Sequence, residues 1–206
     1  VNELNNSDDS TLEVDDKSLK SALDNGLTLT DNIELISPSN VYILTVPTPI
    51  DANKEPDLQP LKKASEMLGA ILEKGDVVIY ESTTYPGCTE EFCVPILESS
   101  SQLKFNKDFY CGYSPERINP GDKKNTLTKI VKVTSGSSPE IALFVDSLYS
   151  SIIEAGTHLA PSMAVAEASK AIENAQRDVN ISFVNELSLI FDRLHLDTRE
   201  VLDAAS

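Results

Sequence analysis

The longest regular pattern in the sequence runs from Pro161 to Leu194, and it restricts the folds that this chain can adopt. Apolar residues recur there every three or four positions, which is the spacing of one face of a helix. They are Val165, Ala168, Ile172, Ala175, Val179, Phe183, Leu187, Ile190 and Leu194. Neither Gly nor Pro interrupts the run after Pro161, so we expect one helix of roughly 50 Å. A helix of this length predicts a bridge between two domains or two subunits.

The face away from this apolar row carries Lys170, Asn174 and Arg177, at spacings that make them neighbours on one helix surface. One interpretation is a solvated polar face, since Lys and Arg are almost always exposed. The other is a row of hydrogen-bond donors for an anionic or oxygen-rich ligand. The helical spacing leaves both interpretations open.

The charge balance limits the partners of the chain. It has 17 Lys and Arg against 33 Asp and Glu in 206 residues, and the net charge of −16 argues against nucleic acid and anionic membrane as partners. No apolar run reaches the length of a membrane span, and no signal peptide opens the sequence. A phosphate-bearing ligand remains compatible, because helix N-termini and single cations bind phosphate locally.

Cys88, Cys93 and Cys111 are odd in number, lack a paired spacing and have no histidine nearby. This pattern predicts buried, reduced thiols in a cytoplasmic protein rather than a disulfide framework. His158 and His195 are far in sequence from each other and from the cysteines. We therefore predict no metal site.

Apolar runs alternate with helical patterns over most of the chain. We expect strands at Leu27–Thr30, Val41–Val46, Val77–Tyr80, Phe109–Tyr113, Lys129–Val133 and Ile152–Glu154. Helices are expected at Lys17–Asn25 after an Asp16 cap, at Asp31–Ile36, at Pro60–Lys74, after a Thr89 cap, and at Pro139–Ser151. The Val41–Val46 run is nearly continuous, as in a strand covered on both faces. The alternation predicts an α/β fold with a largely parallel sheet, doubly wound or part of such a fold.

Three polar or proline-rich loops follow predicted strands, and ligands of such sheets bind beyond the carboxyl ends of the strands. The loops are Val46-Pro47-Thr48-Pro49, Glu81–Gly87 with Ser82, Thr83 and Thr84, and Tyr113–Asp122 with Glu116 and Arg117. The second loop suits a nucleotide, and the Glu116 carboxylate is placed to act as a general base. One such loop alone fits ordinary turn and capping chemistry, but three at one sheet edge predict a ligand site.

Four segments, VPTP, ESTTYPGCTEE, CGYSPERINPGD and SKAIENAQRD, resemble successive segments of the nucleotide-sugar dehydrogenase family. The resemblance extends from about Leu12 to Ser206 and is greatest for the bacterial subgroup acting on UDP-N-acetylhexosamines. It implies an NAD-dependent oxidoreductase that converts the sugar C6 alcohol to an aldehyde and then, through a cysteine-bound thioester, to a carboxylate. The resemblance further implies that two NAD would be reduced and that the uronic acid would serve the synthesis of bacterial surface polysaccharide, including capsule.

The resemblance also implies a cofactor site. Thr48 and Thr83 would contact NAD, with Val46, Pro47 and Ser82 lining the site. The family's glycine-rich turn, which binds the NAD pyrophosphate, has no match in this sequence. Its glycine-rich segment with the nucleophilic cysteine and its UDP-binding domain also have no match, so we expect an internal fragment without catalysis of its own.

For the sugar nucleotide, the resemblance implies residues that take part in the reaction at C6 and residues that position the substrate. Lys170 would stabilise oxyanion character at C6, where a positioned cation is effective, and Asn174 would hold the reacting oxygen or a water molecule. Glu116 would be the base or the carboxylate that orients water. The substrate would also be contacted or positioned by Arg117, Ile118 and Arg177.

On this interpretation residues 1–160 form a partial, Rossmann-like NAD-binding domain that lacks its first βαβ unit. Residues 161–206 form the long central helix and the start of an all-α dimerisation domain, which predicts a homodimer through the central helix. Two alternatives of other classes remain. One is a non-catalytic nucleotide-binding or regulatory module, and the other is an interaction protein that dimerises through the long helix.

Overall fold

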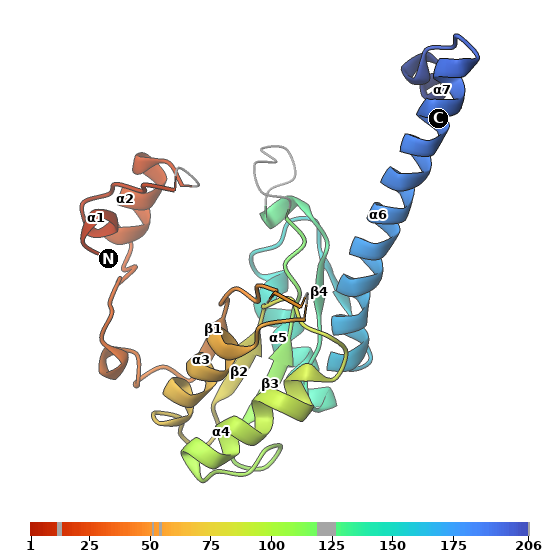
Figure 1. Ribbon diagram of the computed structural model, residues 1–206. Helices are drawn as coiled ribbons and strands as arrows, with labels where there is room; N and C mark the ends of the chain where they lie inside the picture. The colour runs from red at the N-terminus through yellow and green to blue at the C-terminus, as the bar shows by residue number, and fades with distance from the viewer. Residues whose placement is uncertain (12–13, 51, 54, 119–126, 206) are drawn as a thin grey trace.

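The computed structural model describes residues 1–205, except residues 12–13, 51, 54 and 119–126. Within them, the centre of the fold is a parallel sheet in the order β1–β2–β3. Its strands are Val41–Leu44, Val77–Tyr80 and Tyr110–Tyr113 (Figure 1). The α/β class predicted from the sequence is confirmed, and the predicted Val77–Tyr80 strand has the observed bounds.

A second parallel pair consists of β4 (Lys132–Thr134) and β5 (Thr157–Leu159). Gly112 in β3 forms an antiparallel bridge with Gly136, just after β4, so this pair runs opposite to β1–β3. All strand pairs within the two described sheets are parallel, which confirms the expected parallel character, but the strands are divided between two sheets rather than forming one. The bridge depends on glycine, because a Cβ on Gly112 would lie 3.0 Å from the Ser135 carbonyl oxygen and 2.9 Å from Val145.

Several predicted strands differ from the observed ones. β1 ends at Leu44 rather than Val46, and Ile43 is exposed because β1 lies at the edge of the described sheet. Leu27–Thr30 lies outside the strands. Of the predicted Lys129–Val133 strand, Lys129 ends a 3-10 turn, Leu127–Lys129, and β4 begins only at Lys132. Ile152–Glu154 is a turn in which Ile153 packs against α5, and the strand follows it after Gly156.

The helices are α1 (Asn2–Asn5), α2 (Asp16–Asp24), α3 (Gln59–Gly69), α4 (Val94–Ser101), α5 (Pro139–Ser150), α6 (Met163–Arg193) and α7 (Thr198–Ala205). A 3-10 turn covers Ile33–Leu35, and a π-helical turn, Thr89–Cys93, precedes α4. Asp15 rather than Asp16 caps α2, because its carboxylate accepts the Ser18 amide at 3.0 Å. α3 ends at Gly69, five residues before the predicted end, where glycine permits close packing on Ser100 of α4.

Two apolar clusters cover opposite faces of the sheet. Val78 and Tyr80 of β2 pack with residues of α3 and α4, whereas Val77 and Ile79 pack against Val145 of α5 and its neighbours. Successive residues of a strand point to opposite faces, so the continuous apolar run of β2 is buried on both sides. β2 is the strand that fixes the positions of the loops at the sheet edge.

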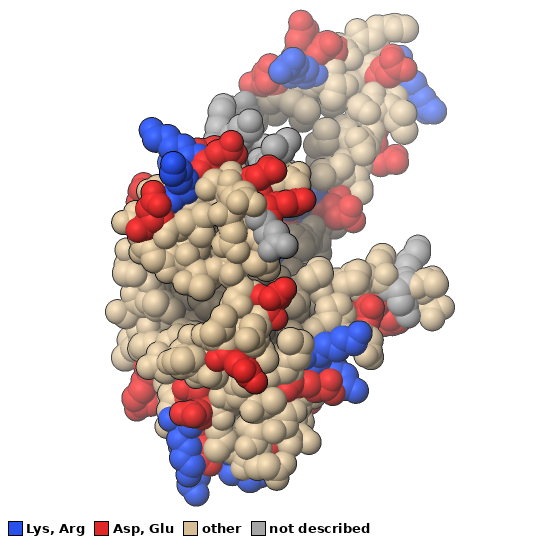
Figure 2. Space-filling view, turned by 90° about the vertical axis from the view of Figure 1, so that its left-hand side faces the viewer, with Lys and Arg blue, Asp and Glu red and all other residues tan. Residues whose placement is uncertain are grey.

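The prediction of one long helix is confirmed by α6, which has 31 residues and is capped by the Ser162 hydroxyl. The structure describes all residues of α6. The buried ones lie near its start and are Met163, Ala166 and Glu167. The C-terminal part of α6 projects away from the sheet toward α7 (Figure 1). Figure 2 shows one face of the molecule coloured by charge. On the described part of this face, Lys and Arg are interspersed with Asp and Glu, without a continuous basic patch.

Candidate functional site

The predicted cofactor residues lie together at the carboxyl ends of β1 and β2. The Thr48 hydroxyl donates a hydrogen bond to the Thr83 carbonyl at 2.6 Å, and the Ser82 hydroxyl donates to the Val46 carbonyl at 2.6 Å. Pro47 and Thr83 remain exposed at this edge, whereas Ser82 is buried. The two loops therefore form one rim of hydroxyl and carbonyl groups.

Tyr113 supports this rim from the end of β3. Its hydroxyl donates a hydrogen bond to the Ser82 carbonyl at 3.0 Å, and its side chain is fully buried. Burial raises the pKa of Tyr113 to about 12, so the phenol remains protonated and continues to donate at neutral pH. The sequence analysis did not identify Tyr113 as a site residue, although it ends the predicted third strand.

Glu116, the predicted base, follows β3 and is held by its own loop. Its Oε1 accepts hydrogen bonds from the backbone amides of Arg117 and Ile118, both at 2.6 Å. Its Oε2 lies 3.7 Å from the Nζ of Lys132. Each of the two carboxylate oxygens therefore has a partner that orients it, and 40% of the side chain remains exposed. Residues 119–122, the end of the SPERINPGD motif, lie outside the described residues.

Glu173 joins this loop to α6 and was missed in the sequence analysis. Its carboxylate lies 3.0 Å from the Nε of Arg117 and, through the other oxygen, 3.0 Å from an Nη of Arg177. Arg117 also donates to the Val131 carbonyl at 3.4 Å. The spacing of four between Glu173 and Arg177 is a sequence signal for an ion pair, but it does not reveal the contact with Arg117.

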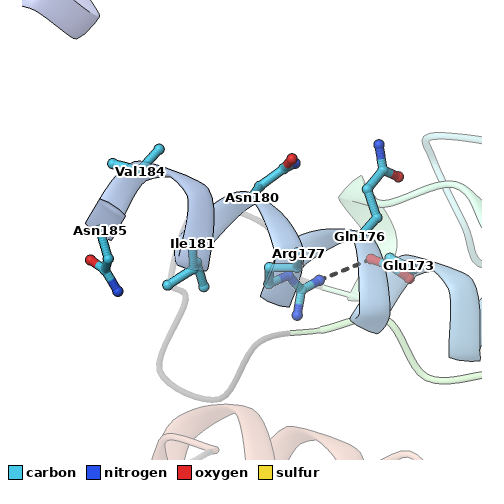
Figure 3. A pocket seen from close by; sticks show the side chains of 7 residues that line it. All are labelled: Glu173, Gln176, Arg177, Asn180, Ile181, Val184 and Asn185. Carbon is cyan, nitrogen blue, oxygen red and sulfur yellow. Dashed lines mark hydrogen bonds and ion pairs between the residues drawn. The ribbon is translucent and has the colours of Figure 1, made fainter. Parts of the chain in front are cut away.

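Figure 3 shows the Glu173–Arg177 pair at one end of an open hollow along α6. The hollow has a volume of about 460 Å³ and is lined by Glu173, Gln176, Arg177, Asn180, Ile181, Val184 and Asn185. These residues extend along the part of α6 that projects from the sheet.

Lys170 lies one turn before Asn174 and is half-buried, whereas Asn174 is exposed. Burial lowers the pKa of Lys170, and the charge of Glu173 partly opposes this change. The electrostatic neighbours of Lys170 also include Glu116 and Arg117. In the same part of α6, Glu173 contacts Arg117, so the structure brings this part of the helix to the charged loop after β3.

Glu167 fastens α6 to the loop after β2, and the sequence analysis missed it. This fully buried carboxylate accepts four hydrogen bonds, from the Thr84 hydroxyl, the Gly87 amide, and the amide and hydroxyl of Thr89. The predicted role of Thr89 as a helix cap is wrong, because its hydroxyl binds Glu167 and it lies within a π-helical turn. An acidic residue between Ala166 and Ala168, one turn after Met163, was the available sequence signal.

A buried charge cluster lies behind the same edge and was also missed. Lys132 is 3% exposed, and its Nζ lies 3.1 Å from the Glu81 carboxylate. The Tyr149 hydroxyl donates a hydrogen bond to the other Glu81 oxygen, and the Lys132 ammonium lies 5.4 Å from the Tyr149 ring centroid. Burial, followed by the charge of Glu81, raises the pKa of Tyr149. The sequence signal was Lys132, which stands between apolar residues in the segment IVKV.

The cysteines do not take part in this edge of the sheet. Cys88, Cys93 and Cys111 are free and buried. Burial raises the pKa of Cys111, and a hydrogen bond with Cys88 together with burial raises that of Cys93. Among the residues that the structure covers, no group of three or more metal-ligating side chains is arranged around a common point. None of the described helices combines the length and apolar character that crossing a membrane requires.

Comparison with known proteins identifies the family to which this sequence is related. Residues 1–153 match the model for the UDP-glucose/GDP-mannose dehydrogenase family, NAD binding domain, and residues 164–206 match the family's central domain. The chain is 60% identical to UDP-N-acetyl-D-glucosamine 6-dehydrogenase of Pseudomonas aeruginosa, over 100% of this chain and 48% of the relative. The protein of the same name from Salmonella typhi is 58% identical, over 98% of this chain and 47% of the relative.

Among solved structures, a UDP-D-ManNAc dehydrogenase from Pyrococcus horikoshii is similar, with a TM-score of 0.85 at 34% identity. The match covers 92% of this chain and 45% of that structure. The chain spans about half the length of the curated relatives it matches. The expectation of NAD as the family cofactor is confirmed by the description of the model that matches residues 1–153. With both family models matched in order along the sequence, the chain belongs to the UDP-glucose/GDP-mannose dehydrogenase family.

Proposed function

We propose that the whole protein catalyses the NAD-dependent, four-electron oxidation of a UDP-N-acetylhexosamine at C6 to the uronic acid. The observation that carries this proposal is the position of Lys170. It is half-buried on α6, one turn before Glu173, whose carboxylate lies 3.0 Å from the Nε of Arg117 in the loop after β3. One turn earlier, Glu167 fixes α6 to the loop after β2. The names of the P. aeruginosa and S. typhi relatives support the same substrate class.

The rim formed by Val46, Pro47, Thr48, Ser82 and Thr83 would hold NAD, which accepts hydride from C6 when bound. The fit rests on the hydrogen bonds that join the two loops and leave Pro47 and Thr83 exposed at the carboxyl ends of parallel strands. Hydroxyl and carbonyl groups suit the carboxamide, the cationic ring and the ribose of the nicotinamide end of the cofactor. They offer no positive charge for a pyrophosphate, so we assign these five residues to the nicotinamide end.

The sugar nucleotide would lie between α6 and the loop after β3. A positively charged Lys170 stabilises negative charge that develops on the C6 oxygen, because a fixed cation in a partly desolvated site interacts strongly with an oxyanion. The exposed amide of Asn174, one turn further along α6, holds the reacting oxygen or a water molecule. Glu116 serves as the base or orients the water. The substrate is positioned by Arg117, Ile118 and Arg177.

We further propose that the protein is a homodimer in which α6 packs against a second copy. Exposed apolar residues support this proposal, since a projecting helix ordinarily buries such a row. They include Ile172, Val179, Phe183, Ile190 and Leu194. On this proposal residues 1–160 form the cofactor part and residues 161–206 begin the dimerisation part. Three free, buried cysteines favour a cytoplasmic location, and the product would supply bacterial surface polysaccharide.

The test is to count the NADH formed per sugar by the full-length gene product. UDP-GlcNAc, UDP-GalNAc, UDP-ManNAc and UDP-glucose are offered separately, and we expect two NADH per molecule of one N-acetylhexosamine. Lys170→Ala should abolish turnover and retain the fold by circular dichroism, while Lys20→Ala, an exposed residue of α2, should retain both. A folded protein that forms no NADH on any of the four would overturn the proposal and favour a non-catalytic nucleotide-binding module.

A further inference from the structure

Lys132 is a buried cation that the proposed reaction does not yet use. It is the first residue of β4, and its side chain is almost entirely removed from solvent. A buried ammonium is stable only when carboxylates or other acceptors compensate for its lost hydration. Two carboxylates lie near it, Glu81 at 3.1 Å and Glu116 at 3.7 Å.

The two carboxylates are not equivalent. Glu81 is the inner partner, because its side chain is 13% exposed and its second oxygen accepts the Tyr149 hydroxyl. Its backbone amide also donates to the Leu44 carbonyl at 2.9 Å. Glu116 is the outer partner and remains accessible to solvent. The Lys132 ammonium is therefore held mainly by Glu81, and it also attracts the Oε2 atom of Glu116.

The position of Lys132 links three elements of the site. Glu81 begins the loop that carries Ser82 and Thr83, and Glu116 belongs to the loop after β3. The backbone amides of Arg117 and Ile118 hold one oxygen of Glu116, so the direction of the other oxygen depends on Lys132. Without the ammonium, the mostly buried Glu81 carboxylate and the partly exposed Glu116 carboxylate would have no cation between them, and their repulsion favours rotation of Glu116 toward solvent.

From this geometry we infer that Lys132 is a positioning residue for the oxidation, which acts by holding the Glu116 carboxylate in its working orientation. The inference rests on the proposed function, because it assigns Lys132 to the reaction through Glu116. A positioning role of Lys132 can be distinguished from a purely structural role by one measurement. The effect of Lys132 on turnover must disappear when Glu116 can no longer act, whereas its effect on stability must remain.

The experiment is a double-mutant cycle in the full-length enzyme with Lys132→Met, Glu116→Gln and the combination. We expect Lys132→Met to lower kcat about 10-fold or more, within the range of general base catalysis, with little change in the KM for NAD. In the Glu116→Gln background, the same change should alter kcat less than about 2-fold. Thermal unfolding should report a similar loss of stability from Lys132→Met in both backgrounds.

Lys74→Met is the matched control, because Lys74 forms an ion pair of 3.0 Å with Asp108 but is 75% exposed. It should leave kcat unchanged. If Lys132→Met does not fold, Lys132→Arg replaces it in the cycle, since arginine keeps the charge but displaces the donor atoms. Equal kcat losses with and without Glu116 would overturn the inference, as would an unchanged kcat in an active enzyme. Absence of NADH formation by the wild type would overturn the proposed function, and this inference with it.

Discussion

The Oε1 atom of Glu167 lies 2.7 Å from the hydroxyl and 2.9 Å from the amide of Thr89, although 78 positions separate the two residues in sequence. The same oxygen accepts the Thr84 hydroxyl at 3.2 Å, and Oε2 accepts the Gly87 amide at 2.5 Å. One carboxylate thus fixes α6 to the loop after β2. Lys170 follows it by one turn, so the position of Lys170 depends on this contact.

Replacing Glu167 by Gln should destabilise the protein, because either orientation of the amide directs its NH₂ group at a hydrogen-bond donor. Leaving buried donors unsatisfied costs about 1–3 kcal/mol, and we expect a loss of this size in the free energy of unfolding. Denaturation in urea measures it. The control is Glu66→Gln on α3, whose pair with Lys62 is 3.8 Å long and largely exposed, and it should change stability by less than about 0.5 kcal/mol. Equal effects of the two changes would contradict the role of Glu167.

Gly136→Ala tests the close approach between the end of β4 and α5. A Cβ at this position would lie 2.3 Å from the Ala142 nitrogen and 2.6 Å from the Ile141 carbonyl carbon, both backbone atoms that cannot move independently. We expect a loss of about 1–3 kcal/mol or more, typical of overpacking. Gly26→Ala is the comparison, because Gly26 has a φ of +102° but open space around it, so that only backbone strain of about 1 kcal/mol applies. A smaller loss for Gly136→Ala than for Gly26→Ala would contradict this packing.

Glu173→Ala should weaken the binding of UDP-sugar more than it weakens the fold. The change removes the shared partner of Arg117 and Arg177. Because these pairs are partly exposed, the loss of stability should be about 1 kcal/mol or less. The released arginines lose their fixed orientation, which raises the Kd for the sugar nucleotide in calorimetry. Glu186→Ala, an exposed residue further along α6, should leave the Kd unchanged. If the two variants bind the sugar nucleotide equally well, Glu173 has no positioning role.

Lys170→Met should lose activity without losing stability at neutral pH. Burial lowers the pKa of Lys170 in the folded protein, so the unfolded chain binds more protons at this residue as pH approaches the ordinary lysine range. The unfavourable contribution of the charged lysine is therefore complete below the folded pKa and is relieved as pH rises through the window up to the unfolded pKa. Relative to the wild type, the variant should be at least as stable at pH 7, and its advantage should decrease toward pH 10. Urea denaturation at both values decides this, and an advantage that increases with pH would contradict it.

Phe183→Asp should convert the proposed dimer of the full-length protein into a monomer. Phe183 is 61% exposed on the projecting part of α6, and a buried, unpaired carboxylate at a helix interface is strongly unfavourable. Light scattering coupled to size exclusion measures the mass directly. Phe183→Leu preserves an apolar side chain and should remain dimeric. A dimer that survives Phe183→Asp would place the interface elsewhere.

The sequence was informative where local patterns decide the structure. The VVIY run of β2 indicates a strand buried on both faces, and the absence of Gly and Pro after Pro161 predicts α6. It misled where an apolar run serves packing rather than pairing. Ile153 is apolar because it packs beneath α5, whereas the more polar Thr157–Leu159 segment forms the strand.

Some residues of the candidate site could be predicted from the sequence, and others could not. Thr48 and Thr83 could be placed together because both follow strands of one sheet. Glu167, Lys132 and Glu173 could not be identified, since charged residues ordinarily face solvent and the contacts that hold these three at the site come from distant segments. The carboxylate of Glu116 was predicted, but its hydrogen bonds to the next two backbone amides depend on loop geometry that residue types do not reveal.

The attachment of α6 near one end gives it the mechanics of a lever. Glu167 lies close to the fulcrum, and the helix continues for about 39 Å to Arg193 at about 1.5 Å per residue. A tilt of about 5° at Glu167 therefore displaces the far end by about 3 Å, by the geometry of a rigid rod of this length. Small differences in how the loop after β2 is seated are magnified roughly in proportion to the length of the arm. The far end of α6 is thus the place where such differences are easiest to measure.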